Sequence, residues 1–164
     1  METSRRLQNK IFFDDRGSFS PLSLKTLEKN WIQSNISYNP KKFTLRGLHF
    51  QKGNFAQSKL IKVINGKILD FVFDMRDTKE SKTLEFFEMG MGDEIIVPRG
   101  YAHGFITLEK DTVVQYLVDN DYKPSEEGVV VWTSFPQIEN EIKSIVPEFE
   151  IDMVIISEKD LVEK

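Results

Sequence analysis

The sequence contains no cysteine, only two histidines and no long hydrophobic run. Without Cys the chain has no disulfide, no thiolate metal site and no Cys nucleophile. Its apolar runs are only a few residues long, far short of the roughly 20 residues that a membrane-spanning helix requires. No apolar run of the signal-peptide type follows residues 1–6. We therefore expect a cytoplasmic protein that makes no membrane contact.

An excess of positive charge is also missing. Lys and Arg number 22 against 26 Asp and Glu, which leaves a formal net charge of -4 over 164 residues. An acidic chain without a basic patch is a poor match to a phosphate backbone, so we expect no nucleic-acid partner. Hydrophobic residues make up 40% of the chain, enough for a sizeable core. No repeat or linker divides the chain, so we expect one domain over residues 1–164.

Aromatic residues are frequent and many stand beside Ile and Val, which favours strands. The clearest local signal is residues 59–74, where two apolar runs flank Asn65-Gly66 and predict a hairpin, because both turn residues tolerate positive φ. Two short helices are expected over residues 21–30 and 139–145. Further strands are expected over residues 10–13, 32–38, 45–50, 83–89, 94–97, 104–108, 112–118 and 129–132. Many short strands separated by turns are typical of an antiparallel sandwich or small barrel.

The two histidines, His49 and His103, each stand in a strand-like segment beside Gly and aromatic residues. A His in a β domain is ordinarily a core-edge side chain with one satisfied hydrogen bond. Two features of the sequence favour a functional role for His49. Gly47 lets the backbone approach closely, and Arg46 offers a cation that a phosphate or carboxylate could use.

A metal site and proton transfer are the two chemistries that fit so few histidines. Two His and a carboxylate could form a facial triad, but Gln51 stands where a paired His-x-His motif needs its second ligand, so we expect no metal. Proton transfer needs one His and a partner that orients it. Spacing alone does not choose the partner among 26 carboxylates. The second acid stays open among Tyr38, Tyr101, Tyr116 and Tyr122, and the cationic anchor between Lys59 and Arg76.

Seven short motifs follow one another in the order found in a known enzyme family. They are residues 15–19 (DRGSF), 33–37 (QSNIS), 45–51 (LRGLHFQ), 57–60 (QSKL), 74–76 (DMR), 97–105 (VPRGYAHGF) and 156–160 (ISEKD). With them the chain resembles the dTDP-4-keto-6-deoxyglucose 3,5-epimerase family of rhamnose biosynthesis over residues 12–160. The resemblance implies a mainly β, cupin-type antiparallel jelly-roll barrel with a few short helices. It also implies an isomerase that acts on a nucleotide-linked 4-keto-6-deoxy sugar in deoxysugar and surface-polysaccharide biosynthesis.

The resemblance further implies roles for individual residues. His49 matches the base that removes the proton next to the keto group, and Asp160 matches its carboxylate partner. Tyr116 matches the acid that returns a proton from the other face, and Lys59 matches the Lys near the enolate oxygen, where its charge would stabilise the oxyanion. The residues that match substrate-binding positions are Arg16, Phe19, Gln33, Asn35, Arg46 and His103. No cofactor is implied, and the expected partner is a second copy, in a homodimer with exchanged N-terminal strands.

Departures from the family pattern keep alternatives open. Pro21 stands where the family commonly has an acidic residue near its nucleoside, and Thr133-Ser134 replaces an Asn-Asp pair. The nucleotide base and the choice of carbon 3, carbon 5 or both are therefore left open, as is a single-carbon epimerase on another nucleotide 4-keto sugar. A non-catalytic sugar-nucleotide-binding cupin would be expected to lose His49, Lys59 or Tyr116, and all three are present. A 3,4-ketoisomerase would be expected to have a second His just after the first, and a metal-dependent cupin oxygenase would need more histidines.

Overall fold

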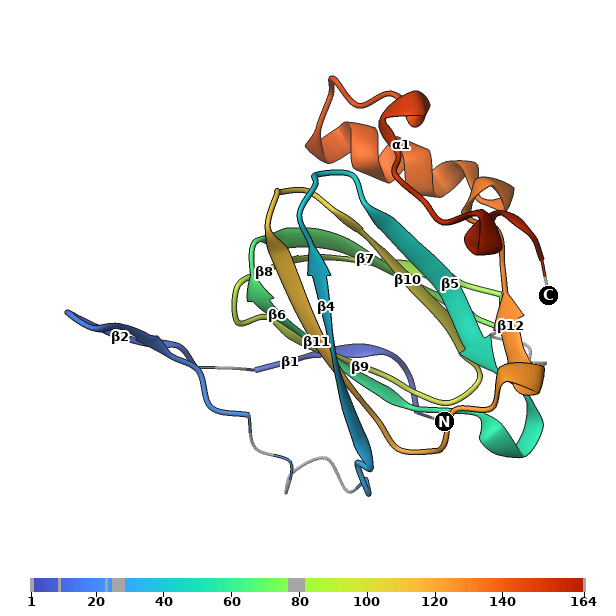
Figure 1. The fold of residues 1–164 in the computed structure, drawn as a ribbon, viewed down its shortest axis with the longest axis horizontal. Coiled ribbons are helices and arrows are strands. Elements are labelled where there is room, and N and C mark those ends of the chain that lie inside the picture. The colour runs from blue at the N-terminus through green and yellow to red at the C-terminus, as the bar shows by residue number, and fades with distance from the viewer. Residues whose placement is uncertain (1, 9, 23, 25–28, 77–81, 164) are drawn as a thin grey trace.

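In the computed structural model, two five-stranded sheets face each other, and a small two-stranded sheet extends away from them (Figure 1). The structure describes residues 2–8, 10–22, 24, 29–76 and 82–163. The first sheet has the order β1 (Arg5–Leu7), β9 (Glu94–Val97), β6 (Lys59–Asn65), β11 (Thr112–Val118), β4 (Gln33–Asn39). The second has the order β12 (Glu127–Val129), β5 (Leu45–Gln51), β10 (Tyr101–Thr107), β7 (Lys67–Asp74), β8 (Leu84–Gly90). All of these pairings are antiparallel, which confirms the predicted mainly β antiparallel architecture.

Most of the predicted strands are present, with shifted ends. The small sheet joins β2 (Phe12–Asp14) and β3 (Gly17–Phe19), so the strand expected over 10–13 begins later. The strand expected over 129–132 is wrong, because β12 ends at Val129 and Trp132–Ser134 is a 3-10 turn. The helix expected over 139–145 is the larger part of α1 (Pro136–Ile145). Half of the helix expected over 21–30, residues 23 and 25–28, lies outside the described residues. No helix among the described residues is long and apolar enough to cross a membrane.

The predicted hairpin over residues 59–74 is wrong. Its strands β6 and β7 lie in different sheets, where β6 pairs with β9 and β11 and β7 pairs with β8 and β10. A type I′ hairpin turn needs positive φ at both central residues, and here only Gly66 has it. A Cβ on Gly66 would lie 2.4 Å from Thr112 Oγ1. The Asn-Gly pair therefore forms a tight corner at which the chain crosses from one sheet to the other.

Successive side chains of a strand point to opposite sides of a sheet, and in the second sheet the side chains on both sides are buried. On its inner face Val72 and Phe105 pack against Ile61 and Val114 of the first sheet. On its outer face the core is capped by the C-terminal segment, whose helix α1 contributes its buried stripe. The main buried residues of this outer core are Leu45, Leu48, Leu69, Phe71, Trp132, Ile138, Ile142 and Phe149. The sheet is thus held from behind, which leaves its inner face to shape the space between the sheets.

A buried ion pair lies on the outer face of the first sheet. Lys62 and Glu94 are register partners on β6 and β9, and Lys62 Nζ lies 2.7 Å from Glu94 Oε1. The same Nζ donates to Ser20 Oγ at 2.9 Å, just after β3. Ile11, just before β2, contacts the neighbouring turn so closely that a Cβ on Gly92 would lie 2.3 Å from its Cδ1. Both ends of the β2–β3 hairpin therefore rest on this part of the sheet.

Replacing Glu94 with Leu is expected to lower the free energy of unfolding by about 3 kcal/mol, because Lys62 would keep a buried charge without an opposite charge beside it. Urea denaturation measures the change. The double variant Lys62→Leu/Glu94→Leu should recover most of the loss. The exposed pair Lys67–Glu88 provides the control, since Glu88→Leu should change stability by less than about 1 kcal/mol. Equal losses in Glu94→Leu and Glu88→Leu would contradict the assignment.

Candidate active site

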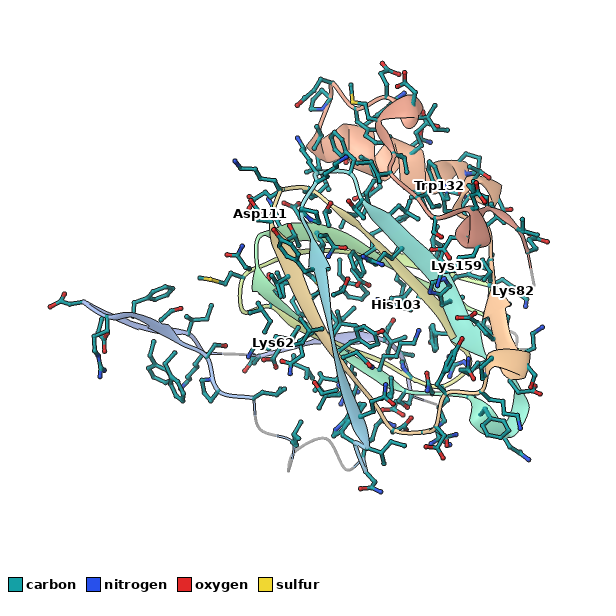
Figure 2. All side chains as sticks on the ribbon, viewed as in Figure 1. Lys62, Lys82, His103, Asp111, Trp132 and Lys159 are labelled. Atoms are coloured by element: carbon teal, nitrogen blue, oxygen red, sulfur yellow. The ribbon has the colours of Figure 1, made fainter. Side chains whose placement is uncertain are left out.

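A pocket of about 850 Å³ opens between the two sheets, and strands of both sheets line it. Figure 2 shows the His103 side chain in the interior between the sheets and Lys159 on the C-terminal 3-10 turn Glu158–Leu161. Eight of the ten residues singled out from the sequence line this pocket. They are Gln33, Asn35, Arg46, His49, Lys59, His103, Tyr116 and Asp160. The structure therefore brings together residues that are up to 127 positions apart, from Gln33 to Asp160.

The register of the first sheet explains one wall of the pocket. Tyr116 of β11 is paired with Asn35 of β4, and Val118 with Gln33, so alternate residues of both strands face the pocket. His49 and His103 are paired with each other on β5 and β10 of the second sheet. The Tyr and the two His side chains thus come from opposite walls.

A β-bulge places Arg46 and His49 on the same face of β5. Residues three apart on a regular strand point to opposite faces, yet both of these line the pocket. The pairing shifts between His103↔His49 and Phe105↔Arg46, so three steps on β5 match two on β10. The extra residue needs close backbone contact at Gly47, which has φ +100 and whose Cβ would lie 2.5 Å from His103 O. The bulge therefore re-aims the side chains of this strand into one site.

His49 is paired with a buried carboxylate from the C-terminal end of the chain. His49 Nε2 lies 2.8 Å from Asp160 Oδ1, and the Gly47 N–H donates to Asp160 Oδ2 at 3.2 Å. Asp160 is only 2% exposed and stands in the 3-10 turn Glu158–Leu161. Burial raises the pKa of Asp160, but the hydrogen bond and charge of His49 and the Gly47 N–H outweigh it, so the pKa is lowered overall. Asp160 therefore remains an anion that orients the His49 ring.

A second His–Asp pair lies deeper in the same wall. His103 Nε2 lies 2.7 Å from Asp70 Oδ2, and both side chains are buried. Burial raises the pKa of Asp70, although the charges of His103 and Lys59 act to lower it. The sequence reasoning did not single out Asp70, although a lone carboxylate within the apolar run of residues 68–73 could have revealed it.

Lys59 and Tyr116 have shifted pKa values that suit them to different tasks. Burial lowers the pKa of Lys59 to about 8, although the charges of Asp70 and Glu127 act in the other direction. The Lys59 ammonium donates to the His49 backbone oxygen at 3.0 Å. Burial raises the pKa of the Tyr116 phenol, and the charge of Arg46 partly offsets this. Tyr116 therefore holds its proton near neutral pH and can donate it.

Arg16 and Phe19, the two remaining predicted residues, do not line the pocket of their own chain. Both stand on the extended β2–β3 hairpin, where Arg16 is bound to Asp14 at 2.5 Å and Phe19 is 65% exposed. Conversely, the pocket contains residues that the sequence reasoning did not select as site residues. The chief ones are Gln57, Glu127 and Lys159. Of the four Tyr candidates for the second acid, Tyr38, Tyr116 and Tyr122 line the pocket. Within the described part of the chain, no group of three or more His, Asp or Glu side chains is arranged to hold a metal ion.

Comparisons with known proteins agree on one family. The family model described as dTDP-4-dehydrorhamnose 3,5-epimerase matches residues 3–164. The chain is 37% identical over 138 residues to the dTDP-4-dehydrorhamnose 3,5-epimerase of Salmonella typhimurium, covering 77% of this chain and 74% of that protein. The structure of the Bacillus anthracis enzyme of the same name, with TDP and PPi bound, is similar with a TM-score of 0.83 and 34% identity, over 98% of this chain and 93% of that one.

A second solved structure shares the fold. The Legionella pneumophila dTDP-6-deoxy-D-glucose-3,5-epimerase, in complex with dTDP-4-keto-L-rhamnose, is similar with a TM-score of 0.80 and 25% identity, over 96% of this chain and 84% of that one. These likenesses confirm the expected cupin-type jelly roll.

The lowered pKa of Lys59 predicts a pH-dependent stability effect. The folded-state value of about 8 lies below the ordinary value of 10.5, so the unfolded state binds more protons between these pH values and stability rises with pH there. Lys59→Met removes the cost of burying the charge, and should raise the free energy of unfolding at pH 7 by about 1–2 kcal/mol. The gain should shrink toward pH 10. Urea denaturation at both pH values tests this, with exposed Lys67→Met as control; a gain independent of pH would contradict it.

Proposed function

The chain belongs to the dTDP-4-dehydrorhamnose 3,5-epimerase family, and from this premise we propose how its pocket works. The protein is an isomerase that epimerises a nucleotide-linked 4-keto-6-deoxy sugar at carbon 3, carbon 5 or both, in rhamnose biosynthesis. The observation that carries the proposed mechanism is that His49 and Tyr116 line one pocket from opposite sheets. A sugar ring between them would have a base on one face and an acid on the other, which is what inversion requires.

His49 is the proposed base. The 4-keto group acidifies the hydrogens on carbons 3 and 5, and removal of one leaves an enolate. Because Nε2 is bonded to Asp160, Nδ1 is the ring nitrogen left to accept the proton. The buried Asp160 anion fixes the tautomer of His49 and stabilises the imidazolium that forms.

Lys59 and Tyr116 complete the proposed reaction. The Lys59 ammonium stabilises the negative charge that develops on the enolate oxygen. Tyr116 then donates its phenolic proton from the opposite face, and the stereocentre inverts. Gln33, Asn35, Arg46 and His103 bind the substrate around these groups. No step of this sequence calls for a cofactor or a metal ion, as the sequence analysis also predicts.

We further propose that two copies share their sites. Arg16 and Phe19 are assigned to the nucleotide and diphosphate, yet they stand on a hairpin that extends away from their own pocket (Figure 1). The hairpin also exposes Phe12 and Phe13, at 54% and 69%. Exposed apolar side chains of this kind mark interaction surfaces. A second copy that receives this hairpin would bury them and would complete both pockets.

The division of labour between His49 and Tyr116 predicts a separation of two activities. His49→Ala should abolish both epimerisation and exchange of the acidic hydrogens with solvent. Tyr116→Phe should retain exchange in deuterated water, while inversion falls roughly a hundred- to ten-thousand-fold. NMR of a dTDP-linked 4-keto-6-deoxy sugar measures exchange and also locates the deuterium on carbon 3 or carbon 5. Undiminished exchange in His49→Ala would overturn the assignment of the base.

The shared site predicts complementation between two inactive proteins. Arg16→Ala damages the hairpin and His49→Ala damages the pocket, so a mixed dimer holds one pocket in which both parts are intact. Refolding equal amounts together should restore about a quarter of wild-type activity at low substrate concentration, since half of randomly formed dimers are mixed. A mixture no more active than Arg16→Ala alone at the same concentration would show that the hairpin does not serve a second copy.

A further inference from the structure

The orientation of Arg46 depends on one buried side chain that does not itself line the pocket. Arg46 Nε donates to Asn39 Oδ1 at 2.8 Å, and this is the one side-chain hydrogen bond of Arg46 within the described residues. The Arg46 side chain lies in the pocket, whereas Asn39, at the end of β4, is 0% exposed. Asn39 thus contacts the site from behind.

The surroundings of Asn39 determine which way its amide points. Its Nδ2 donates to the backbone oxygens of Thr112 at 3.2 Å and Ser37 at 3.3 Å. A flipped amide would place its oxygen against these two carbonyls and its NH₂ against the Arg46 N–H, which would lose every one of these bonds. The Asn39 oxygen must therefore face Arg46.

This contact decides which edge of the guanidinium remains available. An Arg side chain can bind an oxyanion through Nε and one terminal nitrogen, or end-on through its two terminal nitrogens. Asn39 occupies Nε, so the end-on edge with Nη1 and Nη2 is left for a ligand in the pocket. Two parallel N–H donors match two oxygens of one phosphate group.

We propose that Asn39 is a positioning residue that holds Arg46 end-on toward the pocket and thereby sets the affinity for the substrate's diphosphate. The inference rests on the role of Arg46 in the proposed function and adds a residue to it. Arg46 also lies close enough to Tyr116 for its charge to lower the pKa of the phenol. An Arg46 that swings away would therefore weaken anion binding and leave Tyr116 with a less favourable environment as an acid.

A double-mutant cycle on nucleotide binding tests the proposal. Calorimetric titration with dTDP gives the Kd of the wild type, Asn39→Ala, Arg46→Ala and the double variant. Asn39→Ala is expected to raise the Kd roughly tenfold, because a hydrogen bond to a charged group is lost. In the Arg46→Ala background the same change should have almost no effect, since Asn39 acts through Arg46. A purely structural Asn39 would give similar losses in both backgrounds.

Asn65→Ala is a control outside the pocket. Asn65 also donates its amide to a carbonyl next to the start of β11, that of Asp111, and it does not line the pocket. Its substitution should leave the Kd for dTDP unchanged. If Asn39→Ala does not fold, Asn39→Ser keeps a small polar side chain at this buried position, and its hydroxyl is one atom too short to replace the bond to Arg46. The same cycle then applies to that variant.

The outcomes separate this inference from the function on which it rests. An unchanged Kd in Asn39→Ala, or losses that simply add with those of Arg46→Ala, would overturn the positioning role and leave the function intact. An unchanged Kd in Arg46→Ala would instead remove Arg46 from the proposed diphosphate site, and the inference would fail with it. The exchange experiment on His49 and Tyr116 tests the chemistry independently of either result.

Discussion

Charged side chains between two apolar sheets are stable only if each one is paired, and the whole site depends on how this is achieved. The anion Asp160 is held by His49 and by a backbone N–H, while Asp70 is held by His103. Lys59 stands among these groups with a pKa lowered by burial to about 8. The same pairing that makes the charges tolerable gives each group a fixed orientation. In the proposed mechanism, one cavity thus holds a base, an acid and a cation that stabilises the oxyanion, and no metal ion takes part.

The wall behind the site must be rigid for these pairs to hold. The second sheet supplies this rigidity because it is buried on both faces, by the inter-sheet core on one side and by α1 and its flanking turns on the other. The C-terminal segment has two tasks as a result. It packs Ile138 and Ile142 against the back of the sheet, and it then brings Asp160 around the edge to His49, 111 residues earlier in the chain. In the proposed mechanism, stability and catalysis are therefore coupled through one segment.

Two features of the fold, the bulge in β5 and the β2–β3 hairpin, determine which side chains reach the pocket. The bulge at Gly47 turns Arg46 to the same side as His49, and Asn39 fixes the direction of the Arg46 guanidinium. The β2–β3 hairpin is the opposite case, because it carries Arg16 and Phe19 out of reach of their own pocket. The buried Lys62–Glu94 pair contacts the end of this hairpin, because Lys62 donates a hydrogen bond to Ser20, which follows β3. In our proposal, the bulge in β5 helps to complete the site of its own chain, and the β2–β3 hairpin completes the site of a second copy.

The sequence by itself determined the element types and the residue types of the site. Short apolar runs between turn residues predicted most of the strands, though not β1 or β3. The ordered motifs contain His49, Lys59 and Asp160, and the family resemblance that they support added Tyr116. Local pattern could not determine which strands pair, because alternation and turn chemistry act over a few residues whereas pairing depends on how the whole chain closes. Asn65-Gly66 therefore predicted a hairpin where the structure has a corner between sheets. For the same reason only the tertiary structure joined Asp70 to His103, Asn39 to Arg46, and the two walls of the pocket, since each contact spans sequence distances or register shifts that no local pattern records.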